Sequence, residues 1–378
     1  MGVIFNIQEA VNNSAFNILQ EPIKMILERE VEAFERESII PKVFNMRTTD
    51  KYREEFRSVT AMDGFKPVED MEPAGISSFE EGYNKQYVFQ EWKNAFVVSK
   101  QVIEDNEAAS IEPKALGFIK GYGRTRELYA VRMIGAALGN VYPEYRITAN
   151  SGKGMDTTDG TVEGTKQQYF TNAHHRLNDS VGTYNQSNKF YASLTFDGSD
   201  ALLPEKIADV IGQVGSIMHK YKDEKGNIVP VAVKRIVIAE DYVLETALRE
   251  GLRRKFGDSL GGYEIVVSPY LSDITGFTDS DHALLLISPE RNREGMGATW
   301  FDRVPLTVKS FIDDHTDANY WTGRARFGAG FGDFRAMSYI ALTSSGSTNA
   351  TQITPVVAGK PVHVTNPSSA PVYTDEIA

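Results

Sequence analysis

Three residues suited to nucleophilic chemistry occur in the second half of the chain. Ser259 lies in the tetrapeptide Gly-Asp-Ser-Leu, and Asp279 and His282 follow it downstream. A serine triad works only when the fold brings the three side chains within hydrogen-bonding distance, with the serine at a strand end. Because Ser259 follows a predicted helix, we expect no catalytic triad, and we interpret Gly257 as the residue that ends this helix.

Two other runs contain residue types that bind metal ions. They are His174-His175 and the acidic run 313–317. Adjacent residues on a strand point to opposite faces, so neither run closes a three-ligand site by itself. The polarity of the second run is typical of a solvated turn. We therefore predict no metal site, although an enzyme that uses Ser259 or a His/Asp metal site stays open as a minor alternative.

Glycine-rich stretches could bind phosphate groups, but the spacing is wrong in both cases. Gly152-Lys153-Gly154 lacks the spacing of a phosphate-binding loop, and Asp333 stands where the dinucleotide motif needs its third glycine. The glycines before Asp333 instead favour bending of a long strand or close packing against a helix. With catalytic, cofactor-binding and metal-binding residues all predicted to be absent, we expect no enzyme and no cofactor.

Composition narrows the class of protein. The chain has 378 residues, of which 41% are hydrophobic and 24% charged, as in a globular protein. Its net charge of -11 argues against tight, sequence-independent binding of nucleic acid. The absence of cysteine excludes disulfides and thiolate zinc sites. The N-terminus lacks a secretory signal pattern and no stretch approaches about 18 apolar residues, so we expect a soluble protein without a membrane partner.

Alternating residues between positions 46 and 101 predict a long polar hairpin. Residues 48–60 form its first arm and residues 80–101 its return arm, joined by a connection rich in Pro and Gly that contains Phe65 and Lys66. The return arm carries aromatic and apolar side chains on its two faces: Tyr83, Tyr87 and Phe89, then Trp92, Phe96 and Val98. A two-stranded ribbon is only marginally stable alone. We therefore expect a neighbouring copy of the chain to cover these aromatic side chains.

Two amphipathic helices flank the hairpin in sequence. The first begins near Pro22 and ends before Pro41, and the second runs from Ser110 to Gly139. Three glycines in the second helix indicate a bend or a close approach by another backbone: Gly117, Gly121 and Gly123. Its charged residues lie between apolar positions and are interpreted as a solvated face or as intersubunit ion pairs: Arg124, Arg126 and Glu127.

The second half of the chain predicts a compact α/β subdomain followed by a long return strand. Expected strands are 190–196, 235–239, 263–267, 283–287 and 306–311, and expected helices are 204–221 and 242–256. The closing block 320–342 is aromatic and extended, and its glycines Gly328, Gly330 and Gly332 could ease its bending. The tail after Thr343 has no helical period and is predicted to be an extended or mobile appendage.

This order of elements resembles the major capsid proteins of tailed bacteriophages, which share the HK97-type fold. The resemblance is carried by residues 87–106, 117–128 and 324–340. Phe65-Lys66-Pro67-Val68 is similar to the loop tip of coat proteins of Mu-like phages and phages of Gram-positive bacteria. Unlike the best-known pattern, the chain shows no long, charged helical segment ahead of its arm. The resemblance therefore implies a processed chain, a separate scaffolding protein or a scaffolding role for the helix around 23–34, and the start at Met1 favours the last two.

The resemblance implies an α+β fold with named parts. They are an N-terminal arm (1–45), an extended E-loop hairpin (46–98), a P-domain spine helix (99–145), an A-domain (146–319), a P-domain return strand (320–344) and a C-terminal extension (345–378). The implied assembly contacts are Phe65, Lys66, Tyr83, Tyr87, Phe89, Trp92, Arg124, Arg126 and Glu127. The implied flexible glycines, at which a shell could bend as it matures, are Gly117, Gly121, Gly123, Gly328, Gly330 and Gly332.

The function that follows from this resemblance is enclosure. A capsid protein of this kind self-assembles, as pentamers and hexamers, into an icosahedral shell around phage double-stranded DNA. Its expected partners are itself, a scaffolding protein, a portal and, in some shells, a decoration protein, with DNA contacted weakly and non-specifically. The expected location is the virion capsid, assembled in the bacterial cytoplasm. The alternative is an encapsulin-like bacterial compartment that encloses a cargo enzyme.

Overall fold

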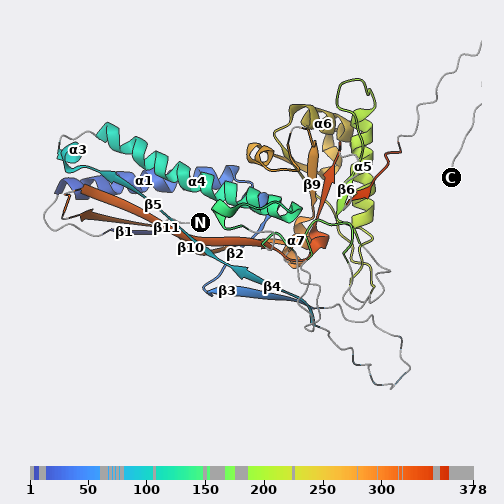
Figure 1. Cartoon of the computed structure of the whole chain (residues 1–378), viewed down its shortest axis with the longest axis horizontal. Helices are drawn as coiled ribbons and strands as arrows, with labels where there is room; N and C mark the ends of the chain where they lie inside the picture. The colour runs from blue at the N-terminus through green and yellow to red at the C-terminus, as the bar shows by residue number, and fades with distance from the viewer. Residues whose placement is uncertain are drawn as a thin grey trace, which may run out of the picture.

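The computed structural model describes residues 4–7, 14–59, 67, 70, 73, 76, 81–104, 108–147, 151–153, 167–174, 186–223, 226–278, 280–295, 297–313, 315–316, 318–343 and 350–356. These residues form two layered bodies, an elongated one built on a five-stranded sheet and a second one built on a six-stranded sheet (Figure 1). The expected α+β class is confirmed. Within the described residues, every helix is too short or too polar to cross a membrane.

The five-stranded sheet is built around two long strands. β10 (Ala298–Asp313) and β11 (Ala318–Phe331) are antiparallel, and β5 (Gln90–Val98) adds to the other edge of β11. At the far edge, β1 (Ile4–Ile7) and β2 (Asn45–Thr48) pair with different segments of β10. The expected strand 306–311 is therefore part of a longer strand, β10.

Two long helices cover one face of this sheet (Figure 1). α1 (Ser14–Glu37) buries Ile23, Leu27 and Val31, which recur every four residues and form one apolar stripe. This stripe packs with apolar residues of α4 (Ala108–Leu138), such as Phe118. Both predicted helices are found, but α1 begins at Ser14, so the predicted start near Pro22 is wrong. α4 ends at Leu138, and Gly139 follows with a φ of 109°, which is readily adopted only by glycine. A short helix, α3 (Lys100–Glu104), precedes α4.

The six-stranded sheet has the strand order β13-β6-β12-β9-β7-β8. Its strands are β6 (Lys189–Tyr191), β7 (Arg235–Ala239), β8 (Glu264–Ser268), β9 (Ala283–Ile287), β12 (Met337–Ala341) and β13 (Thr351–Gln352). α5 (Leu203–Met218) and α6 (Tyr242–Phe256) pack on one face of it. β7, α6 and β9 have the predicted bounds. β8 is shifted by one residue from the predicted strand 263–267.

One apolar core joins the two bodies. It combines the second half of α4 with residues of both sheets, such as Trp300 of β10 and Leu285 of β9. Two short helices also border the junction, α2 (Ile40–Val43) and α7 (Pro289–Glu294). Short 3-10 turns complete the described fold: Pro143–Tyr145, Gly257–Gly262, Pro269–Asp273 and Phe334–Ala336.

The structure corrects two of the predicted extended segments. The return arm of the hairpin is not one strand, because β4 (Glu81–Val88) pairs with β3 (Arg53–Val59) whereas β5 belongs to the five-stranded sheet. The closing block 320–342 is likewise divided between β11 and β12, which lie in different sheets. β3 and β4 therefore form a separate two-stranded ribbon, which projects from the sheet face opposite the helices (Figure 1).

Candidate assembly surface at the base of the hairpin

Aromatic side chains fix the base of the β3–β4 ribbon to the five-stranded sheet. Tyr87 and Phe89 are buried, with exposures of 3% and 6%, and their rings lie 5.0 Å and 5.7 Å from the ring of Phe301. Phe56 of β3 packs against the same cluster. The expectation that a neighbouring copy covers Tyr87 and Phe89 is therefore wrong, because Phe301 of the same chain already does so.

Glycines on β11 make this close packing possible. A Cβ atom on Gly330 would lie 2.6 Å from two ring carbons of Tyr87, and one on Gly328 would lie 2.8 Å from the carbonyl oxygen of Val88. Both distances are below ordinary van der Waals contact, so a larger residue would push the hairpin base away. The predicted close packing at these glycines is thus found, although the partner is the hairpin base and not a helix. Gly332 instead donates a backbone hydrogen bond to Gly297 at 2.6 Å.

The aromatic residues of β5 lie on the opposite face of the sheet, under helix α4. Trp92 stacks on Phe327 with ring centroids 5.2 Å apart, and Phe96 stacks on Trp321 at 5.0 Å. Trp92 is half-buried and packs against the main core. The expectation that Trp92 needs a second copy is therefore also wrong, since its own chain shields most of the ring.

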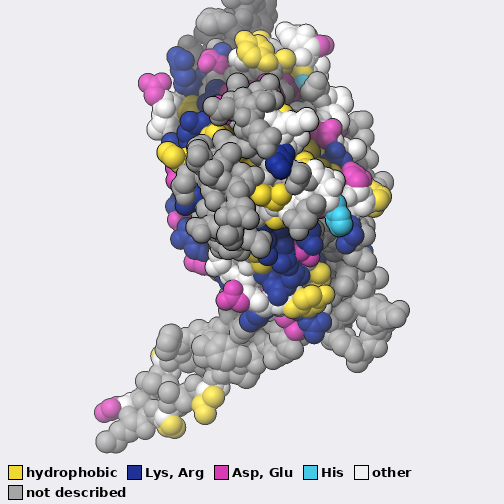
Figure 2. Space-filling model, turned by 90° about the vertical axis from the view of Figure 1, so that its left-hand side faces the viewer, with side chains coloured by type: hydrophobic (Ala, Val, Ile, Leu, Met, Phe, Trp, Pro, Cys, Tyr) yellow, Lys and Arg dark blue, Asp and Glu magenta, His cyan; other side chains and the backbone are white. Residues whose placement is uncertain are grey.

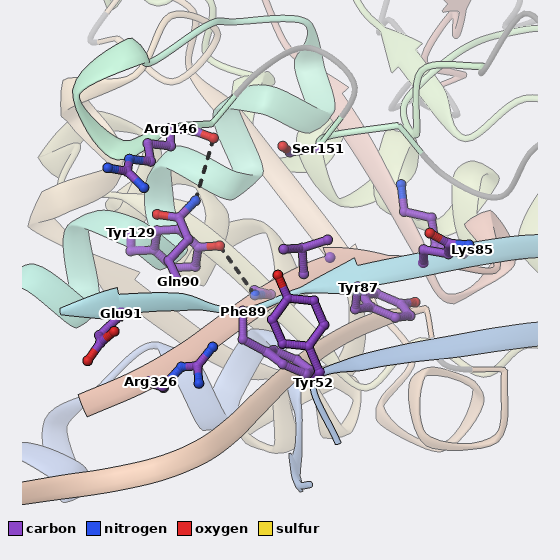
Figure 3. A pocket seen from close by; sticks show the side chains of 14 residues that line it. Tyr52, Lys85, Tyr87, Phe89, Gln90, Glu91, Tyr129, Arg146, Ser151 and Arg326 are labelled. Atoms are coloured by element: carbon purple, nitrogen blue, oxygen red, sulfur yellow. Dashed lines mark hydrogen bonds between the residues drawn. The ribbon is translucent and has the colours of Figure 1, made fainter. Parts of the chain in front are cut away.

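A groove of about 830 Å³ opens beside the hairpin base (Figure 3). It is bounded by β4 and β5, by Arg326 and Gly330 of β11, and by the segment that follows α4. Its side chains come from distant parts of the chain, among them Tyr52, Lys85, Arg146, Ser151 and Arg326. Gln90 donates a hydrogen bond to the carbonyl oxygen of Arg146 at 3.5 Å, which links β5 to the far wall.

The groove is electropositive. Its lining contains three cationic side chains, Lys85, Arg146 and Arg326, and one carboxylate, Glu91. Glu91 pairs with Arg324 at 2.5 Å and with Lys93 at 3.2 Å. The hydrogen bond with Lys93 and the charge of Arg324 hold the pKa of Glu91 below its ordinary value. A local excess of positive charge in a chain of net charge -11 is a feature that composition alone does not reveal.

Exposed cations continue along the open face of the sheet. Lys93, Arg324 and Thr307 lie side by side on β5, β11 and β10, and Lys309 follows two residues along β10. Figure 2, which faces the far end of the elongated body, shows Lys and Arg side chains gathered on its lower part. Arg324 of this face lies two residues along β11 from Arg326 of the groove.

Arg126 and Glu127 of α4 lie in a buried cluster, and Glu127 contacts the residues that follow α1. Arg126 pairs with Asp302 at 3.3 Å, and its guanidinium lies 5.2 Å from the ring centre of Trp300. Ser38 and the backbone N–H of Ile39 both donate hydrogen bonds to Glu127.

Burial raises the pKa of Glu127 and of Asp302 above their ordinary values. The expectation that Arg126 and Glu127 form a solvated face or intersubunit ion pairs is therefore wrong. Arg124 is exposed, and its role in assembly stays a prediction.

The three predicted glycines of α4 have different surroundings. A Cβ atom on Gly117 or Gly121 would meet nothing within 4 Å, whereas one on Gly123 would lie 2.7 Å from the ring of Phe34. Gly123 thus permits α1 to approach α4, which is one of the two predicted explanations. Bending at these glycines during maturation stays a prediction.

The candidate catalytic and metal-binding residues have structural roles where they are described. Ser259 is exposed and donates a hydrogen bond to the carbonyl oxygen of Phe256 at 3.2 Å, and Gly257 ends α6 as predicted. His282 contacts Asp241, whose other carboxylate oxygen caps α6 by accepting from Leu244 at 3.0 Å. Among the described residues, His, Asp and Glu side chains form no group of three that could hold a metal.

Several predicted residues lie outside the described part of the chain. These are Phe65, Lys66, His175, Asp279 and the side chain of Tyr83. Conversely, sequence reasoning missed Phe301, Lys85, Arg146 and Arg326. The cations carried no signal, because the groove unites positions that are far apart in sequence.

Comparison with known proteins gives a likeness of fold alone. Neither the models of known protein families nor the curated proteins contain a match to this sequence. The solved structures that the chain resembles are for the most part phage capsids.

The capsid of the cyanophage P-SCSP1u is 11% identical, with 81% of this chain and 88% of that chain covered and a TM-score of 0.47. The mature capsid of bacteriophage PhiM1 is 11% identical, with coverage of 83% and 87% and a TM-score of 0.44. A virus-like particle from Pyrococcus furiosus is 10% identical, with coverage of 85% and 98% and a TM-score of 0.45. At such values the function has to be argued from the chain's own residues.

Proposed function

We propose that this chain is a major capsid protein, which self-assembles into an icosahedral shell around phage double-stranded DNA. The observation that carries the proposal is the projecting β3–β4 ribbon, whose base is fixed to the sheet while apolar residues around it stay open to solvent (Figure 1). Tyr52 is 69% exposed, Val88 62% and Ile76, in the connection between the strands, 100%. A neighbouring copy can cover these side chains.

A shell is compatible with weak contacts between copies and with the negative net charge of the chain. Contacts that are each too weak for a stable dimer add up when they repeat around closed symmetry. The net charge of -11 suits a wall that encloses DNA without binding it tightly.

The proposed partners are further copies in pentamers and hexamers, a scaffolding protein, a portal and, in some shells, a decoration protein. The proposed place of assembly is the bacterial cytoplasm.

We also propose the division of the chain into arm, E-loop hairpin, spine helix, A-domain and return strand, with one adjustment. β10 falls within the 146–319 range of the proposed A-domain, yet it pairs with β11 along almost its whole length. We therefore count β10 with the sheet under the spine helix, and we count β5 with that same sheet for the same reason.

Electron microscopy of the purified, expressed chain tests the function directly. We expect closed particles from the whole chain. Deletion of residues 58–78 should leave a folded monomer, because the fixed hairpin base lies outside the deleted segment, but should abolish particles. Ser259→Ala is the matched control and should assemble normally. Normal particles from the deletion variant would refute the role of the hairpin, and particles that co-purify with an enzyme and exclude DNA would favour the compartment alternative.

A further inference from the structure

The basic groove at the base of the hairpin combines positive charge with room for a small molecule. We propose that it binds a ligand with several phosphate groups, such as inorganic tripolyphosphate or the phosphate tail of a nucleotide. This ligand would lie between β4, β11 and the segment after α4, and would join the projecting ribbon to the rest of the chain. The inference is independent of the proposed shell function, because it concerns a single copy.

Two of the three cations in the groove have no counter-ion of their own. Arg146 and Arg326 make no ion pair within the described residues. The carboxylate of the groove, Glu91, pairs instead with Arg324 and Lys93, which do not line it. Cations gathered on one concave surface raise the local potential, which favours a bound anion.

The cations reach the groove from three separate elements. Figure 3 shows Lys85 of β4, Arg326 of β11 and Arg146 after α4 on three sides of it. A carboxylate offers two acceptor oxygens in one plane, whereas a chain of phosphate groups offers acceptor oxygens in many directions and binds arginine strongly. Phosphate groups therefore suit cations on three sides better than a carboxylate does.

Two features of the walls indicate a site that is built before the ligand arrives. Arg326 Nε is buried and has no hydrogen-bond partner within the described residues, and such a donor is costly until an acceptor comes near. Arg146 has a left-handed backbone conformation, with φ 54° and ψ 27°, and strain of this kind is often found at binding sites. The volume of about 830 Å³ is that of a small-molecule site.

A ligand in this position would strengthen a junction that is weakly held. Gln90 donates to the carbonyl oxygen of Arg146 at 3.5 Å, which is long for a hydrogen bond. Lys85 donates to the carbonyl oxygen of Lys153 at 2.5 Å. Phosphate groups that accept from Lys85, Arg146 and Arg326 together would add charge-assisted hydrogen bonds between the ribbon, the segment after α4 and β11.

Calorimetric titration of the purified whole chain with inorganic tripolyphosphate tests the site. We expect binding that Arg326→Gln and Arg146→Gln each weaken about ten-fold or more, because each change removes a charge-assisted hydrogen bond. Arg146 is exposed, so Arg146→Gln should fold even if Arg326→Gln does not. Arg253→Gln, at an exposed arginine of α6, is the matched control and should bind like the unmodified chain.

Two comparisons identify the chemistry of the ligand. Butanetetracarboxylate, an anion of similar charge, should bind at least about ten-fold more weakly than tripolyphosphate at the same ionic strength, if the phosphate groups are recognised. ATP without a divalent cation distinguishes the two sources. Equal affinity for ATP and tripolyphosphate would assign the phosphate chain alone, and tighter binding of ATP that Tyr52→Ala abolishes would assign a nucleotide whose base contacts this exposed ring.

Limited proteolysis tests whether the ligand joins the ribbon to the body of the chain. Tripolyphosphate should slow cleavage of the β3–β4 ribbon in the unmodified chain and not in Arg146→Gln, and unchanged cleavage would refute the bridge. Equal affinities of the unmodified chain and both groove variants would overturn the proposal, as would equal binding of the tetracarboxylate. If a DNA duplex bound in an Arg326-dependent way and tripolyphosphate did not displace it, the groove would be a nucleic-acid site and the proposal would be wrong. Each of these results can be read whether or not closed particles form.

Discussion

Replacement of Gly330 by alanine tests whether close packing holds the hairpin base on the sheet. The new Cβ would lie 2.6 Å from two ring carbons of Tyr87, about 1 Å closer than a normal carbon contact. Tyr87 cannot simply retreat, because it is buried and its ring lies 5.0 Å from that of Phe301. Either the ring is strained or the hairpin base lifts from β11.

Ring strain and lifting of the hairpin base predict losses of stability of similar size. Overpacking of a filled site costs about 1–3 kcal/mol. Exposure of the Tyr87 ring costs about 1.5–3 kcal/mol if the base lifts instead. We therefore expect Gly330→Ala to lower the free energy of unfolding in urea by about 1–3 kcal/mol. Limited proteolysis should cut the β3–β4 ribbon faster, and the yield of particles should fall.

Gly121→Ala is the matched control for this experiment. Its Cβ would meet nothing within 4 Å, and the change replaces a poor helix former with the best one inside α4. We expect Gly121→Ala to raise the free energy of unfolding by up to about 1 kcal/mol. Equal effects of the two alanines, or a Gly330→Ala protein as stable as the unmodified chain, would refute the packing argument.

Three further predictions concern the arm and the junction between the two bodies. Gly123→Ala should destabilise the protein by about 1–3 kcal/mol in urea unfolding, because its Cβ would lie 2.7 Å from the Phe34 ring of α1, whereas Gly117→Ala should not. His174 is buried, which lowers its pKa to about 4, so stability should fall by about 3 kcal/mol as pH drops from about 6.5 to about 4. Calorimetry should show a weaker pH dependence in His174→Gln, and an unchanged profile would contradict the assignment. Burial raises the pKa of Glu127, so its contribution is present at low pH and is lost as pH rises through the raised pKa; Glu127→Gln should flatten this dependence, and a steeper profile in the variant would count against it.

Elements with strong local patterns were predictable from the sequence. β7 and β9 are short apolar runs between polar turns, and α6 is an amphipathic segment that ends at Gly257. Each carries enough local information to set its bounds. The N-terminal stripe Ile23, Leu27 and Val31 likewise predicted a helix with one buried face, which it is.

The division of the return arm depends on long-range pairing. Residues 81–98 keep extended alternation throughout, and no local signal separates β4 from β5. What separates them is that β11 pairs with residues 90–98 while β3 pairs with residues 53–59 and 81–88. Because β11 lies more than 200 positions downstream, sequence periodicity cannot reveal which neighbour each half will choose.

The same reason explains the errors at the candidate site. Charged residues on a helix are usually solvated, but Arg126 is buried against Trp300 and pairs with Asp302, 176 positions away in sequence. The basic groove likewise unites residues of the ribbon, the segment after α4 and β11. In contrast, the glycines of β11 were a usable signal, since glycines inside a strand often mark close approach of another backbone.

The correction at Tyr87, Phe89 and Trp92 changes the physical basis of assembly. If these aromatic rings needed a neighbour, the single chain would have an incomplete core and would fold only as the shell formed. Their burial within the chain shows that this part of the core is complete in a single copy, so in the proposed shell it does not depend on a neighbour. Contacts between copies must then use what is left exposed, namely charged surfaces and a few apolar side chains such as Ile76. Such contacts are individually weak and sensitive to salt, so the stability of a shell would come from their repetition and not from any one interface.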